Sequence, residues 1–164
     1  MDNPLLSFSV DEIIEMAQDL ERAGEAFYRR TAALATDAPI RDALLQLAEM
    51  EAAHLQVFSR LREELPGELR VRPSRTPGEA GEHSRYTHAL VRAHAFGPAP
   101  EARLASPLDV LRRAVELEKD AIVFLLDLQE LVPLRQGRRE VERILDEERR
   151  HVRTLNALIT ARSV

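Results

Sequence analysis

The second half of the chain repeats the pattern of the first half, and this internal repeat limits the folds that the chain can adopt. Residues 9–64 align with residues 106–161 at an offset of 97 positions without a gap. The identical pairs include Ser9 and Ser106, Ala17 and Ala114, Leu20 and Leu117, Glu21 and Glu118, Phe27 and Phe124, Leu34 and Leu131, Glu51 and Glu148, and His54 and His151. Amphipathic helix pairs often share leucines and alanines, but shared acids and histidines need another explanation.

Apolar residues recur at the spacing of an α-helix in four segments. A capping box at Ser9 and Glu12 precedes the first predicted helix, which runs toward Leu34. The second follows a turn at residues 37–39 and ends at residues 65–67, the third extends from Ser106 to residues 132–133, and the fourth begins after Gly137 and includes Leu158. No segment of the sequence alternates for long enough to predict a strand, so we expect an all-α fold.

Proline and glycine are concentrated between the two halves. We predict one domain over residues 1–164, with helix pairs at about 9–65 and 106–161 and a crossover at about 66–105. About 40 connecting residues are enough to span a helix of about 38 Å, so the second and third helices can be parallel neighbours. This connectivity is that of a four-helix bundle with one long crossover. Within the crossover, the apolar spacing of residues 83–96 favours a short extra helix.

Composition excludes several kinds of site and partner. The chain has no cysteine, which excludes disulfides, thiolate metal sites and a rubredoxin-like module. The formal net charge of -5 argues against nucleic-acid binding. The start of the sequence has no basic segment, and no apolar run approaches the roughly 20 residues of a membrane span. We therefore expect a cytoplasmic protein that neither enters a membrane nor is exported.

Six polar residues lie on apolar stripes, where they would face the core. They are Glu21 and Glu118 on the first and third predicted helices, and the Glu-x-x-His pairs Glu51 with His54 and Glu148 with His151 on the second and fourth. Residues three apart lie on one face of a helix. No lysine or arginine shares these stripes. Four carboxylates directed into one core would need protons or cations to balance their charge.

The donor set favours metal ions. Six oxygen and nitrogen ligands suit two divalent ions, which would balance the four negative charges. The arrangement matches the general pattern of di-iron carboxylate bundles. The crossover histidines His83, His88 and His94 lack a glutamate three positions earlier, and we expect no such role for them. We predict two iron ions, with manganese or zinc as alternatives.

These features resemble the ferritin-like superfamily and, within it, the rubrerythrin-type diiron domain. The segment Glu21-Arg-Ala-Gly-Glu-Ala-Phe-Tyr28 is similar to the first-helix motif of that family, and Leu47-Ala-Glu-Met-Glu-Ala-Ala-His54 is similar to its second-helix motif. The resemblance implies that Glu21 and Glu118 are terminal ligands, that Glu51 and Glu148 bridge the two ions, and that His54 and His151 bind one ion each.

The resemblance also implies a reaction, the oxidation of a diferrous centre by hydrogen peroxide or dioxygen. An external electron-donor protein would return the electrons, and the family favours a homodimer. Tyr28 is the candidate catalytic side chain, with simple packing as the alternative. The sequence departs from the family where Ala121 replaces a further ligand glutamate, and Leu125 occupies the repeat position of a second tyrosine.

Two other functions fit the same residues. One is a ferroxidase subunit of an iron-storage cage, and the other is a non-enzymatic helical module that holds zinc or no metal.

The acids near the inward faces, Glu25, Glu49, Asp146 and Glu147, are expected to be solvated.

Overall fold

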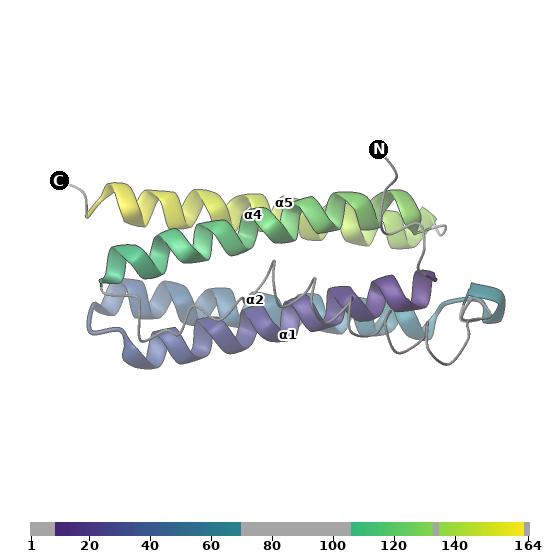
Figure 1. Ribbon diagram of the computed structural model, residues 1–164, viewed down its shortest axis with the longest axis horizontal. Helices are drawn as coiled ribbons and strands as arrows, with labels where there is room; N and C mark the ends of the chain where they lie inside the picture. Colours follow the sequence, from purple (N-terminus) through teal and green to yellow (C-terminus); the bar gives the residue numbers. More distant parts are fainter. Residues whose placement is uncertain (1–8, 70–105, 133–134, 163–164) are drawn as a thin grey trace, which may run out of the picture.

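The computed structural model of the protein describes residues 9–69, 106–132 and 135–162. Within these ranges the fold is an all-α bundle without strands, which confirms the predicted fold class (Figure 1). Its elements are α1 (Val10–Leu34), α2 (Ala38–Glu63), a short 3-10 helix η2 (Gly67–Leu69), α4 (Pro107–Leu131) and α5 (Arg135–Thr160). The expected extra helix at 83–96 and the three crossover histidines lie outside the described residues.

Local capping explains where three of the helices begin. The Ser9 hydroxyl accepts a hydrogen bond from the Glu12 amide at 3.2 Å, and the Glu12 carboxylate accepts one from the Ser9 amide at 2.9 Å. The Asp37 carboxylate caps α2 in the same way, and the Ser106 hydroxyl caps α4. These side chains satisfy backbone donors that the first turn of a helix leaves unpaired.

The fourth long helix begins earlier than the sequence predicts. Helix α5 begins at Arg135, so Gly137 lies inside its first turn and is buried. The Arg138 guanidinium donates a hydrogen bond to the Val132 carbonyl at 2.7 Å, which ties this turn to the end of α4. A glycine costs a helix only about 1 kcal/mol relative to alanine, so tertiary contacts can override its local preference.

The four long helices form two antiparallel pairs (Figure 1). Helices α1 and α2 run in opposite directions, as do α4 and α5, while α2 and α4 run in the same direction. Helices approach each other more closely within a pair than between pairs, and the pairs meet through α1 with α4 and through α2 with α5. The parallel helices α2 and α4 are therefore diagonal rather than adjacent, which corrects the expectation that the second and third helices are neighbours.

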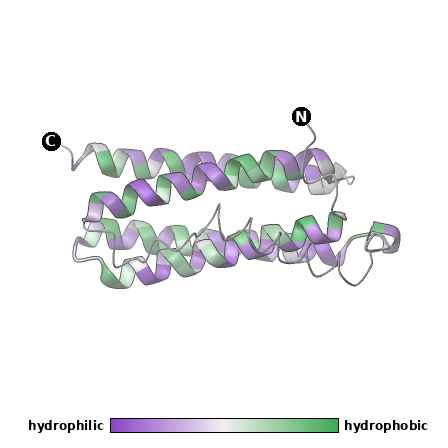
Figure 2. Ribbon diagram, viewed as in Figure 1, coloured by the Kyte–Doolittle hydropathy of each residue, from purple (hydrophilic) through white to green (hydrophobic). Residues whose placement is uncertain are grey.

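Two apolar clusters fill the bundle interior. One contains Ile14, Phe58 and Ile144, and the other contains Phe27 and Leu44, which lie nearer the turn between α1 and α2. Apolar and polar residues recur along every helix rather than gathering at one end (Figure 2). The burial of these side chains stabilises the bundle, at about 25 cal/mol for each Å² of apolar surface removed from water.

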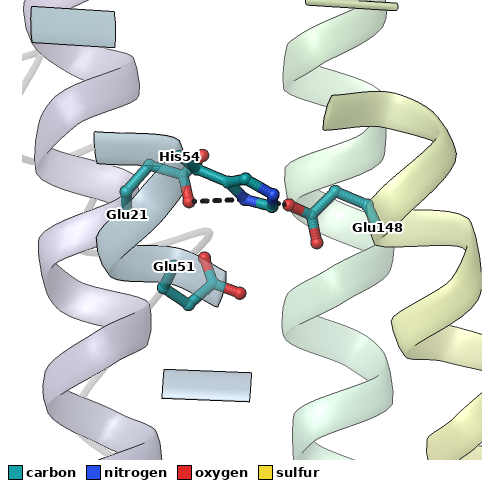
Figure 3. Close-up of side chains that lie close together, drawn as sticks. All are labelled: Glu21, Glu51, His54 and Glu148. Atoms are coloured by element: carbon teal, nitrogen blue, oxygen red, sulfur yellow. Dashed lines mark ion pairs between the residues drawn. The ribbon is translucent and has the colours of Figure 1, made fainter. Parts of the chain in front are cut away.

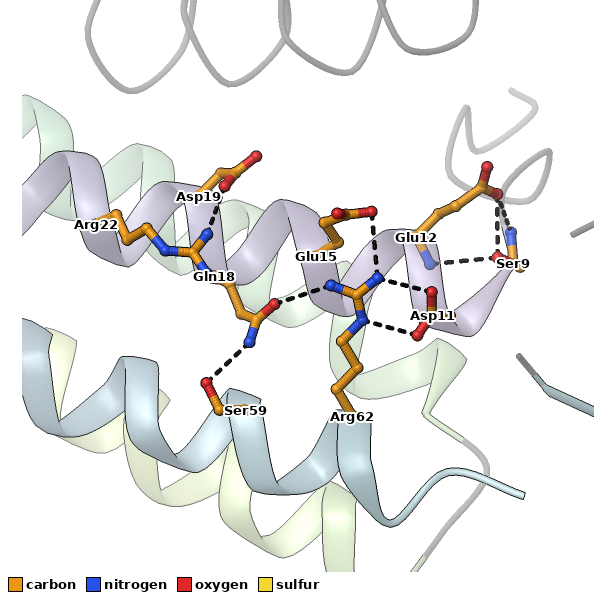
Figure 4. Close-up of polar contacts among 9 residues, drawn as sticks. All are labelled: Ser9, Asp11, Glu12, Glu15, Gln18, Asp19, Arg22, Ser59 and Arg62. Atoms are coloured by element: carbon orange, nitrogen blue, oxygen red, sulfur yellow. Dashed lines mark hydrogen bonds and ion pairs between the residues drawn. The ribbon is translucent and has the colours of Figure 1, made fainter. Parts of the chain in front are cut away.

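A polar network between α1 and α2 sets how these helices are aligned (Figure 4). The Arg62 guanidinium donates two hydrogen bonds to Asp11, at 2.8 and 2.9 Å, and a third to Gln18 at 3.2 Å. The buried Gln18 amide donates in turn to the Ser59 hydroxyl at 2.9 Å. Bidentate contacts of this kind are directional, so they resist sliding of one helix along the other.

None of the helices within residues 9–69, 106–132 and 135–162 has an apolar stretch long enough to cross a lipid bilayer.

Candidate metal centre

The six polar residues that the sequence directs inward all lie together in the bundle interior. Each is buried, with at most 6% of its surface exposed. Glu21 comes from α1, Glu51 and His54 from α2, Glu118 from α4, and Glu148 and His151 from α5. On every helix, apolar core residues precede and follow these positions, so the polar layer separates the two apolar clusters.

The six side chains form two overlapping groups that could each hold a metal ion. The first group consists of Glu21, Glu51, His54 and Glu148, and the second consists of Glu51, Glu118, Glu148 and His151. In each group one ligand atom from every residue lies within 4.8 Å of the others. Glu51 and Glu148 belong to both groups, so two ions placed here would share two carboxylates.

Glu148 lies between the two imidazole rings. His54 Nδ1 lies 2.9 Å from one carboxylate oxygen of Glu148 and 3.5 Å from Glu21 Oε2 (Figure 3). His151 Nδ1 lies 2.9 Å from the other Glu148 oxygen and 3.5 Å from Glu118 Oε1. The two rings stack with centroids 5.9 Å apart. The same nitrogen of each ring therefore faces the shared carboxylates.

Several of these atoms are close together without being hydrogen-bonded. Among the described residues, the buried polar atoms without a hydrogen-bond partner include Glu21 Oε1, Glu51 Oε1, both oxygens of Glu148, and Nδ1 of His54 and His151. Leaving one such atom unpaired costs about 1–3 kcal/mol. A cation contacts all these atoms at once, and oxygen with imidazole nitrogen suits iron, manganese or zinc. The residues therefore fit a pair of divalent ions.

Without metal, protons must balance the buried negative charge. Burial raises the pKa of Glu21 and Glu51 well above the usual range, and the charge of Glu148 adds to both shifts. Burial and the charge of Glu148 also raise the pKa of Glu118 to about 8. Burial disfavours the charged form of Glu148 as well, but its close contacts with Glu118 and the two histidines outweigh burial and lower its pKa below the usual value. The central carboxylate is therefore the ionised one.

Both histidines carry a proton in the metal-free protein at neutral pH. Burial alone would lower their pKa values, but contacts with the buried glutamates outweigh it. Glu148 is the main partner that raises the pKa of His54 to about 9, and Glu118 with Glu148 raises that of His151 to about 10. A protonated imidazole carries a hydrogen on both nitrogens, so a metal ion bound at Nδ1 would displace the hydrogen that faces the cluster.

Tyr28 contacts a candidate ligand and also packs in the core. Its hydroxyl donates a hydrogen bond to Glu118, and its ring packs edge-to-face against Phe27 in the core. Burial and the charge of Glu118 raise the pKa of the Tyr28 hydroxyl well above its usual value, so it remains a donor. The contact to Glu118 holds one candidate ligand in place.

The structure corrects the expectation that Glu147 is solvated. Its carboxylate lies 2.9 Å from His54 Nε2, on the opposite side of the ring from the cluster. The sequence signal was its place immediately before Glu148, but which residue it meets depends on how α2 and α5 pack. The other flanking acids pair with arginines: Glu25 and Glu49 with Arg29, and Asp146 with Arg149.

A small cavity adjoins the cluster between α1 and α4. Its volume is about 20 Å³, enough for a molecule of about the size of water. The cavity is lined by Glu21, Gly24, Tyr28, Glu51, Glu118 and Ala121, among others. A Cβ at Gly24 would lie only 3.2 Å from Glu51 Oε2, so the glycine leaves room for that carboxylate. The cavity therefore reaches the candidate ligands.

Comparisons with known proteins bear on the fold and the family of the chain. A crystal structure from Thermotoga maritima, of a protein described as a candidate ferritin-like diiron-carboxylate protein, has a similar fold with a TM-score of 0.69 and 22% sequence identity. The alignment covers 95% of this chain and 97% of that one. Among curated proteins, none matches the chain significantly. The family model Rubrerythrin matches residues 12–159, nearly the whole sequence, and the chain therefore belongs to the rubrerythrin family.

Proposed function

We propose that this chain is a diiron carboxylate oxidoreductase that reduces hydrogen peroxide or dioxygen. The observation that carries the proposal is the pair of buried groups that share Glu51 and Glu148. Four carboxylates would balance the charge of two ferrous ions, and the unpaired ring nitrogens would become ligands. In this assignment Glu21 and His54 complete one position, and Glu118 and His151 complete the other.

The bound iron pair would supply the two electrons that, with two protons from solvent, convert hydrogen peroxide into two molecules of water. An external electron-donor protein would return these electrons to the iron pair. From the family resemblance we also propose that the chain forms a homodimer.

The chain's own residues would prepare the site for this reaction. The cavity beside Gly24 and Ala121 adjoins the candidate ligands, and in this proposal it is where the oxidant approaches them. Tyr28 holds the Glu118 carboxylate through its hydrogen bond. The apolar clusters on either side keep bulk water from the cluster, which strengthens its electrostatic interactions. Every ligand must be deprotonated to bind metal, so protons leave the histidines and glutamates as the site fills.

Metal analysis and rapid mixing test the proposal. Protein loaded anaerobically with Fe²⁺ is expected to hold two ions per chain and to be oxidised by hydrogen peroxide or by air in stopped-flow absorbance. Glu51→Ala is expected to lose both properties. Glu49→Ala is the matched control, because Glu49 lies on the same helix with its side chain 70% exposed, and it is expected to keep both.

Three results would count against the proposal. Failure of the loaded protein to react with either oxidant would refute it. Particles of hundreds of kilodaltons in size-exclusion chromatography, with oxidation by air faster than by peroxide, would favour an iron-storage ferroxidase. Zinc as the only metal retained, or no metal, would favour a non-enzymatic module.

A further inference from the structure

The two histidines of the cluster have different partners on their outer sides. His54 Nε2 lies 2.9 Å from a Glu147 oxygen, whereas His151 Nε2 lies 3.3 Å from the Met50 sulfur. Met50 and Glu147 occupy equivalent positions in the internal repeat, each immediately before the glutamate of a Glu-x-x-His pair. The repeat is therefore symmetric in its candidate ligands and asymmetric in the residues behind them.

The outer partner affects how strongly each ring binds a cation. When Nδ1 binds an ion, Nε2 carries the hydrogen of the neutral ring and donates it outward. A carboxylate accepts this hydrogen strongly, which fixes the ring and makes Nδ1 a better donor to the ion. A thioether sulfur is a weak acceptor and does this poorly. Loss of such a carboxylate partner lowers metal affinity by about 10–100-fold.

A second difference also favours tighter binding of a cation by the Glu21–His54 group than by the Glu118–His151 group. Tyr28 donates a hydrogen bond to Glu118, and this occupies a carboxylate oxygen of the His151 group. The repeat counterpart of Tyr28 is Leu125, which has no donor to offer Glu21. The two histidine side chains are otherwise equally buried, at 2% and 3% exposed, and both groups share the same two carboxylates.

We propose that the two metal positions differ in affinity and that the Glu21–His54 position fills first. Glu147 is the positioning residue that causes this order. The inference rests on the proposed metal centre. It requires that Glu147 act through His54, because its carboxylate contacts the outer nitrogen of the ring. The Glu118–His151 position, with Met50 behind it, then holds its ion less tightly.

Calorimetric titration of the metal-free full chain with Co²⁺ tests the inference. The wild-type protein is expected to bind two ions in separate steps, the first at least about 10-fold tighter. Glu21→Ala should remove the tight step, and Glu118→Ala the weak one. Glu147→Met should weaken the first step and bring the two affinities together, while Met50→Glu should tighten the second. The double exchange, Met50→Glu with Glu147→Met, should make the Glu118–His151 position the tighter one.

The controls separate a positioning role from a folding role. Glu147→Asp is expected to restore part of the difference between the steps, and Glu147→Gln keeps the side-chain shape should the methionine variant fail to fold. Circular dichroism of each metal-free variant should match that of the wild type. Two Co²⁺ ions bound with equal affinity, or a ratio of affinities unchanged in Glu147→Met and Glu147→Gln, overturns the inference alone. Binding of fewer than two ions to the wild type overturns the metal centre and the inference with it.

Discussion

Loading the metal-free protein with divalent ions at pH 7 is expected to release protons. The pKa values of His54, His151 and Glu118 are about 9, 10 and 8 in the metal-free cluster. At pH 7 each of these groups is at least about 90% protonated. Because metal ligands must be deprotonated, these groups should release about three protons per chain. Glu21 and Glu51, whose pKa values are also raised by burial, add up to two more.

Calorimetry in buffers with different ionisation enthalpies measures this release. The slope of binding enthalpy against buffer ionisation enthalpy gives the number of protons, which we expect to lie between three and five for Co²⁺ at pH 7. The number should fall as pH rises through 8, 9 and 10, because the free cluster has then already lost its protons. Metal affinity should rise over the same interval, since fewer protons compete with the ion.

A release of less than one proton for two bound ions at pH 7 would refute this reasoning. Such a result would mean that the ions bind to carboxylates that are already ionised in solution, as exposed acids are. Glu49→Ala should release as many protons as the wild type, because this acid is exposed and outside the cluster. Glu118→Ala should release fewer, because it removes one protonated ligand.

Three further predictions concern single residues and pH. Gly24→Ala places a Cβ 3.2 Å from Glu51 Oε2, so we expect about 10-fold weaker Co²⁺ binding with unchanged helix content by circular dichroism, and unaltered binding would contradict the role given to the glycine. Tyr28→Phe removes the buried hydrogen bond to Glu118 and should lower the free energy of unfolding in urea by about 1–2 kcal/mol, whereas no change would show that the bond contributes nothing. The two histidines titrate near 6.5 when unfolded and near 9 and 10 when folded, so their contribution to metal-free stability should be complete below about pH 6.5 and lost as pH rises through 9 and 10. Urea unfolding at pH 7 and pH 10.5 measures this loss, and a metal-free protein that is more stable at pH 10.5 would disprove it.

Most of the fold could be predicted because its signals are local. A helix start depends on a capping side chain within three residues, as at Ser9 and Ser106, and an inward face depends on the period of one helix. The start of α5 was wrong by three residues because contacts with the end of α4 outweighed the local preference of Gly137. The residues of the candidate site stood out for a related reason, since acids on an apolar stripe are costly without a partner.

The residues behind the cluster could not be predicted in the same way. Glu147 was assigned to solvent because its place on α5 is beside the inward face rather than on it. Its contact with His54 joins residues from two halves of the chain, and it depends on how close α5 lies to α2. The same packing of α2 against α5 places the Met50 sulfur next to His151 Nε2. No local pattern encodes the distance between helices.

The sequence by itself determined which side chains each helix directs inward, because that depends only on the helical period and on where each helix begins. It also determined the kind of chemistry available, since oxygen and imidazole ligands in that number suit a pair of cations. Only the tertiary structure decided which helices are adjacent and which carboxylates two ions would share. It alone set Glu147 behind one histidine and Met50 behind the other, because contacts between helices depend on the packing of the whole bundle.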